Sequence, residues 1–561
     1  MVIFFILYTP IFSSAQSSAY PRDYFRNPLG IPMLLAGNFG ECRPGHFHSG
    51  LDIKTMGREN LAVYAAADGY ISRIKMEPGG FGHGLYITHP NGYSTLYAHL
   101  NDFVPAIQKY VRQQQYAKES WTVDLSFNPD QFPVKQSEQI AWSGNTGGST
   151  APHLHFEIRD TKTEHPLNPE LFGFGIKDSR APVPLRLAVY GTAVSIYRQE
   201  PQLFSLKKKA DAYYPSQDTI EVTAGIIPIG IEVNDYMDGS ENTLAFYTAE
   251  WYLADQLQGS ILLDDIGYEE TRYLHAYADY KMKQRTGNWF QLLYRLQGNK
   301  LEKLYKNLNP NRGALNPGTY DALPLRIILK DVAGNTATVS CYIRVVDGID
   351  SKPCTASMDW KAGVARTYSD PGCSFSLDDG LLYDDVCDSV RSAEMPGAVS
   401  RRYSIFSPEI PAHHYFPLSL RAGSLLPFAL RNKIAMMYSD GRSTSGKAAG
   451  IAEKGWYTAK VRGFGDYWLA VDTSAPIVKS LTALKGHLGK SKSIAFRATD
   501  NFTSVQAFRG ELNGKWILFE QHGSTWTYVL DEHCPKGPHK LVIKAKDENG
   551  NEARASFTFT R

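Results

Sequence analysis

The chain has 561 residues, more than one domain usually contains, so we expect about three or four domains. Hydrophobic residues make up 43% of the chain, which is enough for several cores. The 59 basic and 57 acidic residues leave a formal net charge of +2. This balance argues against nucleic acid or an anionic membrane surface as a partner.

The N-terminal stretch has the pattern of a secretory signal peptide. Residues 1–15 begin with an apolar run, and Ser13 and Ala15 place small residues before a cleavage site at Gln16. A membrane anchor needs about 20 apolar residues, and Pro10 interrupts this run too early. We therefore expect an exported protein without a stable membrane anchor, located in the periplasm, in the cell envelope or in the medium.

Two short stretches carry the residue types of one metal site. They are His48-Ser49-Gly50-Leu51-Asp52 and Pro152-His153-Leu154-His155-Phe156-Glu157. The second alternates polar and apolar residues as a half-buried strand does, so its two histidines project from one face. In the first, Gly50 lets the chain bend between a histidine and a carboxylate. Two nitrogens and one oxygen, with a fourth position left to water, are typical of a catalytic zinc.

Each stretch alone is a weak signal, because a lone histidine is usually a surface or satisfied core residue. The distribution of histidines strengthens it, since seven of the 15 fall within residues 46–155. Among them lie glycine-rich segments at 79–84 and 144–148 and the sequence Tyr97-Ala98-His99-Leu100. Glycines at such positions suit tight turns that bring strand ends together.

The ordered set H-x-G-x-D, Y-A-H-L and S-G-N-T-G-x-S-T-x-P-H-L-H-F-E resembles the lysostaphin-type (LytM-like) zinc endopeptidases. The resemblance covers roughly residues 30–160 and implies an antiparallel β-sheet peptidase domain with a zinc groove within residues 16–175. The zinc ligands that it implies are His48, Asp52 and His155. The non-ligand catalytic pair that it implies is His99 and His153.

This resemblance implies hydrolysis of peptide cross-links in bacterial peptidoglycan, during wall remodelling or lysis, with Zn²⁺ as the cofactor. His153 is placed to act as the base and His99 as a hydrogen-bond donor to the oxyanion. Two other functions stay open. One is a catalytically silent regulator of other wall hydrolases, and the other is an envelope scaffold whose β domains bind partners. A zinc carboxypeptidase of the D-Ala-D-Ala type fits poorly, because its His-to-Asp spacing is longer.

One segment departs from the simpler members of that family, which have a brief turn there. The insert at residues 101–133 carries Ile107, Tyr110 and Val111 at helical spacing after Pro105, which predicts a short helix beside the groove. Before it, residues 85–97 read as a hairpin around an Asn-Gly turn. His99 would then lie just past the second strand of that hairpin.

An internal repeat follows residue 175. Segments 178–182 and 472–476 share the pattern Asp-x-x-Ala-Pro, with a serine between, and segments 331–335 and 547–551 share Asp-x-x-Gly-Asn. The second pair lies between strand-like runs, as an Asx-Gly turn between two antiparallel strands does. These signals resemble bacterial immunoglobulin-like sandwiches. Calcium binding by the Asp-x-x-Gly-Asn segments is an alternative that we rank below turn geometry.

We therefore expect a mainly β protein in which the peptidase domain is followed by immunoglobulin-like β-sandwich domains. Their expected bounds are 178–347 for a sandwich with insertions, 348–471 for a further β-rich domain and 472–561 for a C-terminal sandwich. Four of the six cysteines are clustered, namely Cys341, Cys354, Cys373 and Cys387. In an oxidising compartment they would form two disulfides, in one of three pairings, or remain buried thiols.

The first testable prediction concerns export. We expect the mature protein to begin at or near Gln16 and to lie outside the cytoplasm, because small residues precede that position. N-terminal sequencing of the native protein measures this. An intact Met1, or a protein confined to the cytosol, would contradict it.

Overall fold

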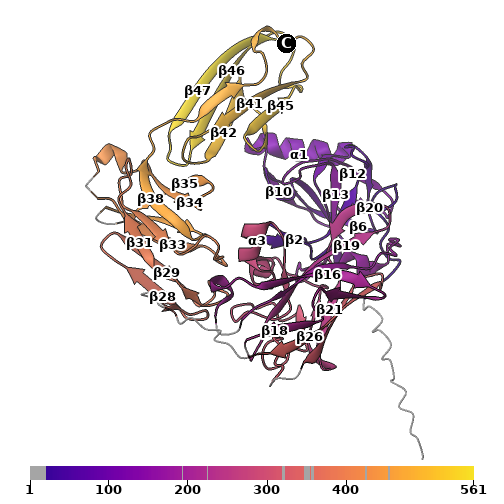
Figure 1. The fold of residues 1–561 in the computed structure, drawn as a ribbon. Helices are drawn as coiled ribbons and strands as arrows, with labels where there is room; N and C mark the ends of the chain where they lie inside the picture. The colour runs from indigo at the N-terminus through magenta and orange to yellow at the C-terminus, as the bar shows by residue number, and fades with distance from the viewer. Residues whose placement is uncertain are drawn as a thin grey trace, which may run out of the picture.

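The fold is mainly β, as the sequence predicts (Figure 1). This computed structural model describes residues 20–191, 194–223, 225–318, 322–346, 354, 359–423, 426–452 and 455–561. The predicted signal peptide at residues 1–15 lies outside the described residues. The α-helices of the described part are α1 (Pro105–Lys118), α2 (Leu274–Tyr277) and α3 (Tyr280–Thr286). None of its helices is long and apolar enough to cross a membrane.

The N-terminal part is built on a nine-stranded antiparallel sheet. Seven strands run in the order β1 (Leu35–Gly37), β4 (Leu51–Lys54), β13 (His153–Asp160), β8 (Tyr93–Ala98), β7 (His83–Thr88), β6 (Gly69–Met76) and β10 (Val123–Ser126). Two short strands extend it, β11 (Pro133–Val134) on β6 and β14 (Pro166–Leu167) on β13. A second sheet contains β5 (Ala62–Tyr64), β12 (Gln139–Ser143) and β9 (Leu100–Phe103), and a small hairpin contains β2 (Cys42–Arg43) and β3 (His46–Phe47).

The predicted hairpin and the predicted insert helix are both confirmed. Strands β7 and β8 pair around the turn at Gly92. Helix α1 begins with Pro105, whose fixed φ suits the first turn, and it buries Ile107 and Val111 against the sheet. It ends at Glu119, which adopts a left-handed conformation with φ of 46°.

The middle of the chain forms a twelve-stranded sheet. Its main order is β20 (Ser240–Leu244), β19 (Ile229–Met237), β15 (Val183–Val189), β16 (Gln202–Lys209), β17 (Ala212–Pro215), β26 (Thr336–Val345), β25 (Leu323–Lys330), β21 (Thr248–Leu253), β22 (Gln256–Leu262) and β24 (Tyr305–Lys306). Strand β18 (Thr219–Val222) pairs with β26, and β23 (Gln291–Leu292) pairs with β19. Helices α2 and α3 lie in the long connection between β22 and β23.

The last two parts of the chain each enclose a core between two sheets. The first pair is β28 (Arg366–Ser369), β29 (Cys373–Leu377), β33 (Phe416–Arg421), β37 (Trp456–Val461) and β36 (Gly450–Ile451), facing β31 (Val390–Ala393), β32 (Arg402–Ile405), β38 (Gly465–Val471), β34 (Ile434–Ser439) and β35 (Thr444–Ala448). Beside it, β27 (Asp359–Trp360) pairs with β30 (Val386–Cys387). The second pair is β39 (Ile477–Ser480), β41 (Ser493–Thr499), β45 (Thr525–Val529) and β44 (Glu520–His522), facing β40 (Lys485–His487), β47 (Glu552–Thr560), β46 (Pro538–Asp547), β42 (Val505–Leu512) and β43 (Lys515–Ile517).

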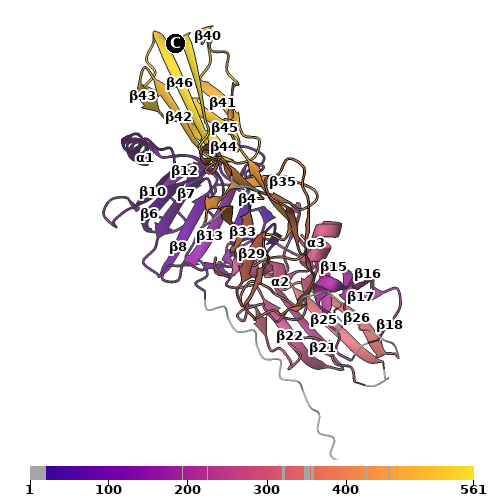
Figure 2. The same cartoon turned by 90° about the vertical axis from the view of Figure 1, so that its left-hand side faces the viewer.

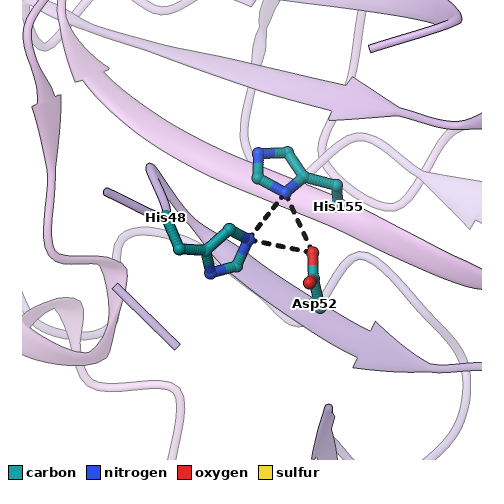
Figure 3. Close-up of side chains that lie close together, drawn as sticks. All are labelled: His48, Asp52 and His155. Carbon is teal, nitrogen blue, oxygen red and sulfur yellow. Dashed lines mark hydrogen bonds and ion pairs between the residues drawn. The ribbon is translucent and has the colours of Figure 1, made fainter. Parts of the chain in front are cut away.

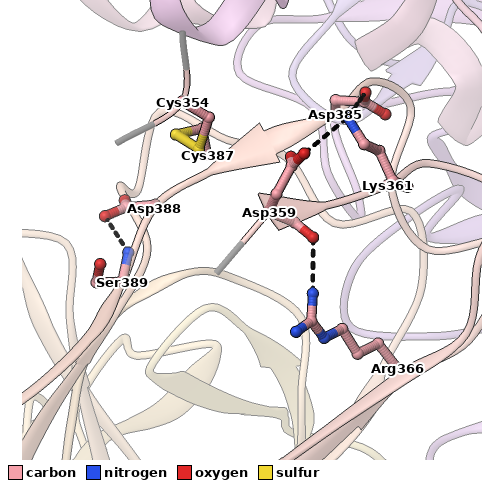
Figure 4. Close-up of a disulfide and its surroundings, with 8 residues drawn as sticks. All are labelled: Cys354, Asp359, Lys361, Arg366, Asp385, Cys387, Asp388 and Ser389. Carbon is pink, nitrogen blue, oxygen red and sulfur yellow. Dashed lines mark hydrogen bonds and ion pairs between the residues drawn. A yellow bond between two sulfur atoms is a disulfide. The ribbon is translucent and has the colours of Figure 1, made fainter. Parts of the chain in front are cut away.

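The expectation of two disulfides in the cysteine cluster is wrong for the described residues. Cys354 and Cys387 form one disulfide beside the β27–β30 pair (Figure 4). Cys341 is a free, buried thiol in the core of the twelve-stranded sheet, and Cys373 is a free, buried thiol on β29. The two thiols belong to different cores, so closeness in sequence does not bring them together.

The chain curls so that its C-terminal part returns to helix α1 (Figures 1 and 2). The Tyr116 hydroxyl donates a hydrogen bond to Asp531 at 2.7 Å, and its ring stacks on His533 with centroids 3.8 Å apart. Arg509 forms an ion pair with Glu119 at the end of the same helix. The predicted insert therefore carries several of the contacts between the first and last parts of the chain.

The predicted domain borders can be tested by limited proteolysis. We expect cuts near the predicted borders at residues 178, 348 and 472, because domain borders are exposed linkers that few contacts cross. The cut sites are read by mass spectrometry of the fragments. Cuts gathered within residues 500–545 would contradict a folded C-terminal pair of sheets.

Candidate metal centre

The pairing of β4 with β13 places the two sequence stretches side by side. In this antiparallel register, Asp52 lies directly opposite His155. His48 precedes β4 by three residues and turns its ring toward both, as Figure 3 shows. Gly50 makes this turn possible, because a Cβ there would lie 2.3 Å from the Phe156 carbonyl oxygen. The structure thus brings together the three ligands that the sequence predicts.

The three side chains present one atom each to a common point. Asp52 Oδ1 lies 3.0 Å from His48 Nε2 and 3.0 Å from His155 Nδ1, and the two nitrogens are 3.1 Å apart. Ligand atoms about 2.0–2.2 Å from a tetrahedral zinc would lie about 3.3 Å from one another. The observed distances are close to this value, so the three atoms are spaced as in a metal coordination site. All three residues are also buried.

When both rings are neutral, the outer hydrogen bonds hold the single proton of each ring away from these three atoms. His48 Nδ1 lies 2.7 Å from the Asn38 carbonyl oxygen, which only accepts, so Nδ1 carries the proton of the neutral ring. His155 Nε2 lies 2.9 Å from a Glu157 carboxylate oxygen and carries the proton for the same reason. Two nitrogen lone pairs and a carboxylate then face one point. A cation satisfies that set, which is why the residues present fit a metal ion.

Burial and charge set the protonation of this group. Burial lowers the pKa of His48 to about 4. Burial also lowers the pKa of His155, but its hydrogen bonds to Asp52 and Glu157 outweigh that effect and raise the pKa to about 9. Without a metal, His155 therefore holds an extra proton at neutral pH. Metal binding must release that proton, so metal affinity falls in acid.

Arg43 fixes the second oxygen of the aspartate. It lies on the β2–β3 hairpin, and its Nη2 donates to Asp52 Oδ2 at 2.8 Å and to Glu41 at 3.0 Å. This contact orients the carboxylate so that Oδ1 faces the histidines. The sequence analysis did not assign a role to Arg43, because nothing in a lone Cys-Arg-Pro stretch indicates it.

The two predicted non-ligand histidines lie next to the three ligands. The His99 and His153 rings have centroids 4.7 Å apart, and His153 Nε2 is 3.3 Å from Asp52 Oδ1. His99 Nδ1 donates to the Thr146 carbonyl oxygen at 2.8 Å, and His153 Nδ1 donates to the Ala151 carbonyl oxygen at 2.8 Å. In both neutral rings Nε2 is the free acceptor.

Two glycine-rich segments hold His99 in place. Gly82 has φ of 62° and Gly147 has φ of 72°, and a Cβ on either would lie within 2.5 Å of the other segment's backbone. This close approach positions the Thr146 carbonyl that His99 contacts. His99 itself has φ of 58°, a conformation that costs about 1–3 kcal/mol when the surroundings enforce it.

A buried carboxylate behind the metal ligands was missed by the sequence analysis. Glu157 is fully buried, and it accepts hydrogen bonds from His155, from Arg159 and from the Tyr268 hydroxyl, which lies 2.8 Å away. Strand alternation places Glu157 on the same face as His155 and could have indicated it. Tyr268 comes from the loop after β22 of the next sheet, and no local pattern marks it.

Three other histidines of the same sequence cluster lie outside the metal centre. His46 is exposed. His89 bonds to the Asp68 carbonyl and to Thr95. His83 lies 2.9 Å from Glu520 of the C-terminal part. The cluster in sequence therefore contributes four of its seven members to the site.

Residues 46–119 match the model of Peptidase family M23. The resemblance to lysostaphin-type peptidases is thereby confirmed for this part of the chain. Residues 356–472 match the model of a Zu5-like domain. The M23 match contains His48, Asp52 and His99.

Similar proteins align with the same region. The DD-carboxypeptidase/endopeptidase Mpg of Neisseria meningitidis is 35% identical over 122 residues, which are 22% of each chain. The murein hydrolase activator NlpD of Salmonella typhimurium is 31% identical over 147 residues, covering 26% of this chain and 31% of that protein. The catalytic domain of lysostaphin from Staphylococcus simulans is 24% identical, with a TM-score of 0.18, and the match covers 24% of this chain and 85% of that one. The chain thus spans less than a third of the length of these two curated relatives.

The geometry predicts which substitutions remove the metal ion. His48→Ala, Asp52→Ala and His155→Ala each delete one of three ligand atoms, so we expect them to lose the metal or to bind it far more weakly. His153→Ala and His99→Ala leave the three atoms intact and should keep near-stoichiometric metal. Metal content of the five purified variants measures this. If His155→Ala kept its metal and His153→Ala lost it, then His153 would be the metal ligand on β13 in place of His155.

Proposed function

We propose that the protein is a zinc-dependent endopeptidase that hydrolyses peptide cross-links of bacterial peptidoglycan. The observation that carries this proposal is the convergence of Asp52 Oδ1, His48 Nε2 and His155 Nδ1 on one point, beside two further imidazoles. A non-catalytic relative needs neither the ligands nor the extra pair. The names of similar proteins, a DD-carboxypeptidase/endopeptidase among them, support the substrate class.

The ligand set favours zinc over harder cations. Imidazole nitrogens with one carboxylate suit zinc, and three protein ligands leave a position for water or substrate. When bound, zinc lowers the pKa of a water molecule and polarises the scissile carbonyl. His48, Asp52 and His155 would hold it, while Arg43 and Glu157 orient the carboxylate and the second imidazole.

The two remaining histidines handle protons. His153 Nε2 lies 3.3 Å from Asp52 Oδ1, which places it to take a proton from a water molecule at the candidate metal centre. The same proton can then pass to the leaving amine. Burial and the neighbouring His155 and His153 lower the pKa of His99 to about 3, so its ring stays neutral. It can donate a hydrogen bond to the developing oxyanion in the tautomer that carries the ring proton on Nε2.

A second candidate function is regulation of other wall hydrolases without catalysis. The similarity to a murein hydrolase activator favours it. The five assembled residues favour the enzyme, because a regulator gains nothing from keeping three converging ligand atoms and two oriented imidazoles. In both cases we propose a location outside the cytoplasm, where peptidoglycan lies and where the predicted signal peptide would direct the chain.

The proposed reaction is tested on purified peptidoglycans that differ in cross-link chemistry, with mass analysis of the fragments. We expect new amino termini at one class of cross-link. His153→Ala should keep its metal while its turnover falls by about 10²–10⁴, the usual scale for a positioned acid–base group. The turnover of His99→Ala should fall by about 10²–10³, as it does when an oxyanion donor is removed.

The matched control is His522→Ala, which removes an exposed histidine on β44 and should leave turnover unchanged. A metal-loaded wild-type protein that releases no fragment from any peptidoglycan would refute the enzyme. If that protein still accelerates a second wall hydrolase, the regulator is the better account. If all five site variants cleaved peptidoglycan as fast as the wild-type protein, the reaction would take place at another site.

A further inference from the structure

Two groups of three aspartates lie outside the metal centre, one in each copy of the internal repeat. The first contains Asp178, Asp235 and Asp331, and the second contains Asp472, Asp500 and Asp547. Within each group, one carboxylate oxygen of every residue lies within 4.8 Å of the other two. The sequence repeat marks the first and last aspartate of each group, and the structure adds a middle one.

The two groups are built in the same way. In each copy the first aspartate lies five residues before the opening strand, β15 or β39. The first residues of these strands, Val183 and Ile477, pair with Asn234 and Thr499, and the middle aspartate is the next residue in both copies. The third aspartate stands at the final hairpin, β25–β26 or β46–β47. The same register thus creates the same acidic group twice.

Turn geometry accounts for only part of each group. The Asn335 side chain donates to the Asp331 carboxylate at 2.7 Å and to the Asp178 carbonyl at 3.2 Å. In the second copy, the corresponding amide of Asn551 donates to Asp547 at 2.7 Å and to the Asp472 carbonyl at 3.1 Å. These bonds order the hairpin and the opening segment. They do not involve the middle aspartates.

Buried oxygen atoms at both groups have no hydrogen-bond partner. Asp235 is 2% exposed, and its Oδ1 is buried and unpartnered. Asn549 is 6% exposed, and its side chain reaches Asp472 through Nδ2 while its Oδ1 is unpartnered. Asp500 Oδ1 is also unpartnered. Leaving a buried polar atom unpaired costs about 1–3 kcal/mol, so such atoms at the same place in two copies require an explanation.

The like charges within each group add to this cost. Burial and the charges of Asp331 and Asp178 raise the pKa of Asp235 to about 8. Burial, with the charge of Asp331, raises the pKa of Asp178 to about 6. Burial and the charges of Asp178 and Asp331 also raise the pKa of neighbouring Glu170 to about 7. The second group carries less excess negative charge, because Lys433 lies near Asp472. The Lys433 amine also donates a hydrogen bond to the Asn549 backbone carbonyl.

We propose that each aspartate group binds one Ca²⁺ ion. All the side-chain atoms offered are oxygens, and calcium takes 6–8 oxygen ligands, which carboxylates, amide oxygens, backbone carbonyls and water together supply. Zinc would prefer the nitrogen and sulfur ligands that these groups lack. The ion neutralises the crowded carboxylates and gives the unpartnered oxygens of Asp235, Asp500 and Asn549 a partner.

The position of the groups indicates what the ions would do. Asp178 lies in the segment that leads from the N-terminal part into β15, and Asp472 directly follows β38. Each ion would therefore tie a linker residue to the end of the β unit that follows it. Calcium would stiffen both junctions and hold the parts of the chain in the arrangement that returns the C-terminal part to helix α1. This inference does not depend on the proposed peptidase activity.

The test is equilibrium dialysis of the zinc-loaded full chain against CaCl₂, with calcium and zinc measured together. We expect two calcium ions per chain, and one in Asp235→Asn and in Asp500→Asn, because each variant removes a charged ligand without changing side-chain size. The double variant should bind none. Asp255→Asn, an exposed aspartate in the β21–β22 turn, is the matched control and should bind two.

Thermal unfolding separates lost binding from lost folding. Without calcium, Asp235→Asn should melt at or above the wild-type temperature, because a buried carboxyl group beside Asp178 and Asp331 is gone. Asp500→Asn should melt near the wild-type temperature, because the amide keeps the side-chain size. With calcium near 100 times its Kd, wild-type Tm should rise by about 5 °C while the double variant stays unchanged. No bound calcium at about 10 mM, well above the usual range for exported modules, would overturn the proposal. A single variant that still binds two ions would refute the site in its copy, and binding of MgCl₂ in place of CaCl₂ would refute the choice of ion.

Discussion

The candidate metal centre depends on one strand pairing. The antiparallel register of β4 with β13 sets Asp52 opposite His155, and the turn before β4 brings His48 to the same point. A shift of one residue would move the carboxylate to the other face of the sheet, because side chains alternate along a strand. The buried residues on the core side, Leu154 and Phe156 among them, make such a shift costly. Packing of apolar side chains thus fixes the geometry of a polar site.

Outer contacts then determine what this geometry can do. A carbonyl oxygen and a buried carboxylate hold the protons of His48 and His155 away from the centre, so lone pairs face the metal position. In His99 and His153 a backbone carbonyl oxygen accepts the Nδ1 proton in the same way, so Nε2 of each neutral ring carries no proton. Because each ring uses one nitrogen for support, only the other is available for metal binding or proton transfer. The proposed division between metal ligands and proton carriers rests on which atoms converge.

Local patterns predicted much of this fold, and long-range contacts explain what they missed. The hairpin before His99 and helix α1 are set by turn residues and by apolar spacing, which a short stretch of sequence contains. The roles of Arg43 and Tyr268 arise from packing between segments distant in the chain, which no single stretch encodes. Only one of the two predicted disulfides is present, since Cys341 and Cys373 belong to different cores. The sequence did not predict the middle aspartates either, because the register of two paired strands, and not a sequence motif, places them in the groups.

The metal centre also extends beyond the part of the chain that resembles a peptidase. Glu157 is a fully buried carboxylate, and burying a charge is costly unless it is paired and hydrogen-bonded. Arg159 supplies the opposite charge, but the Tyr268 hydroxyl that contacts both Glu157 oxygens comes from the following unit. The Arg159 guanidinium also lies over the Tyr268 ring, 4.8 Å from its centroid. Displacing that unit would expose and loosen the carboxylate that orients His155. The twelve-stranded unit that contains Tyr268 is therefore part of the physical support of the site.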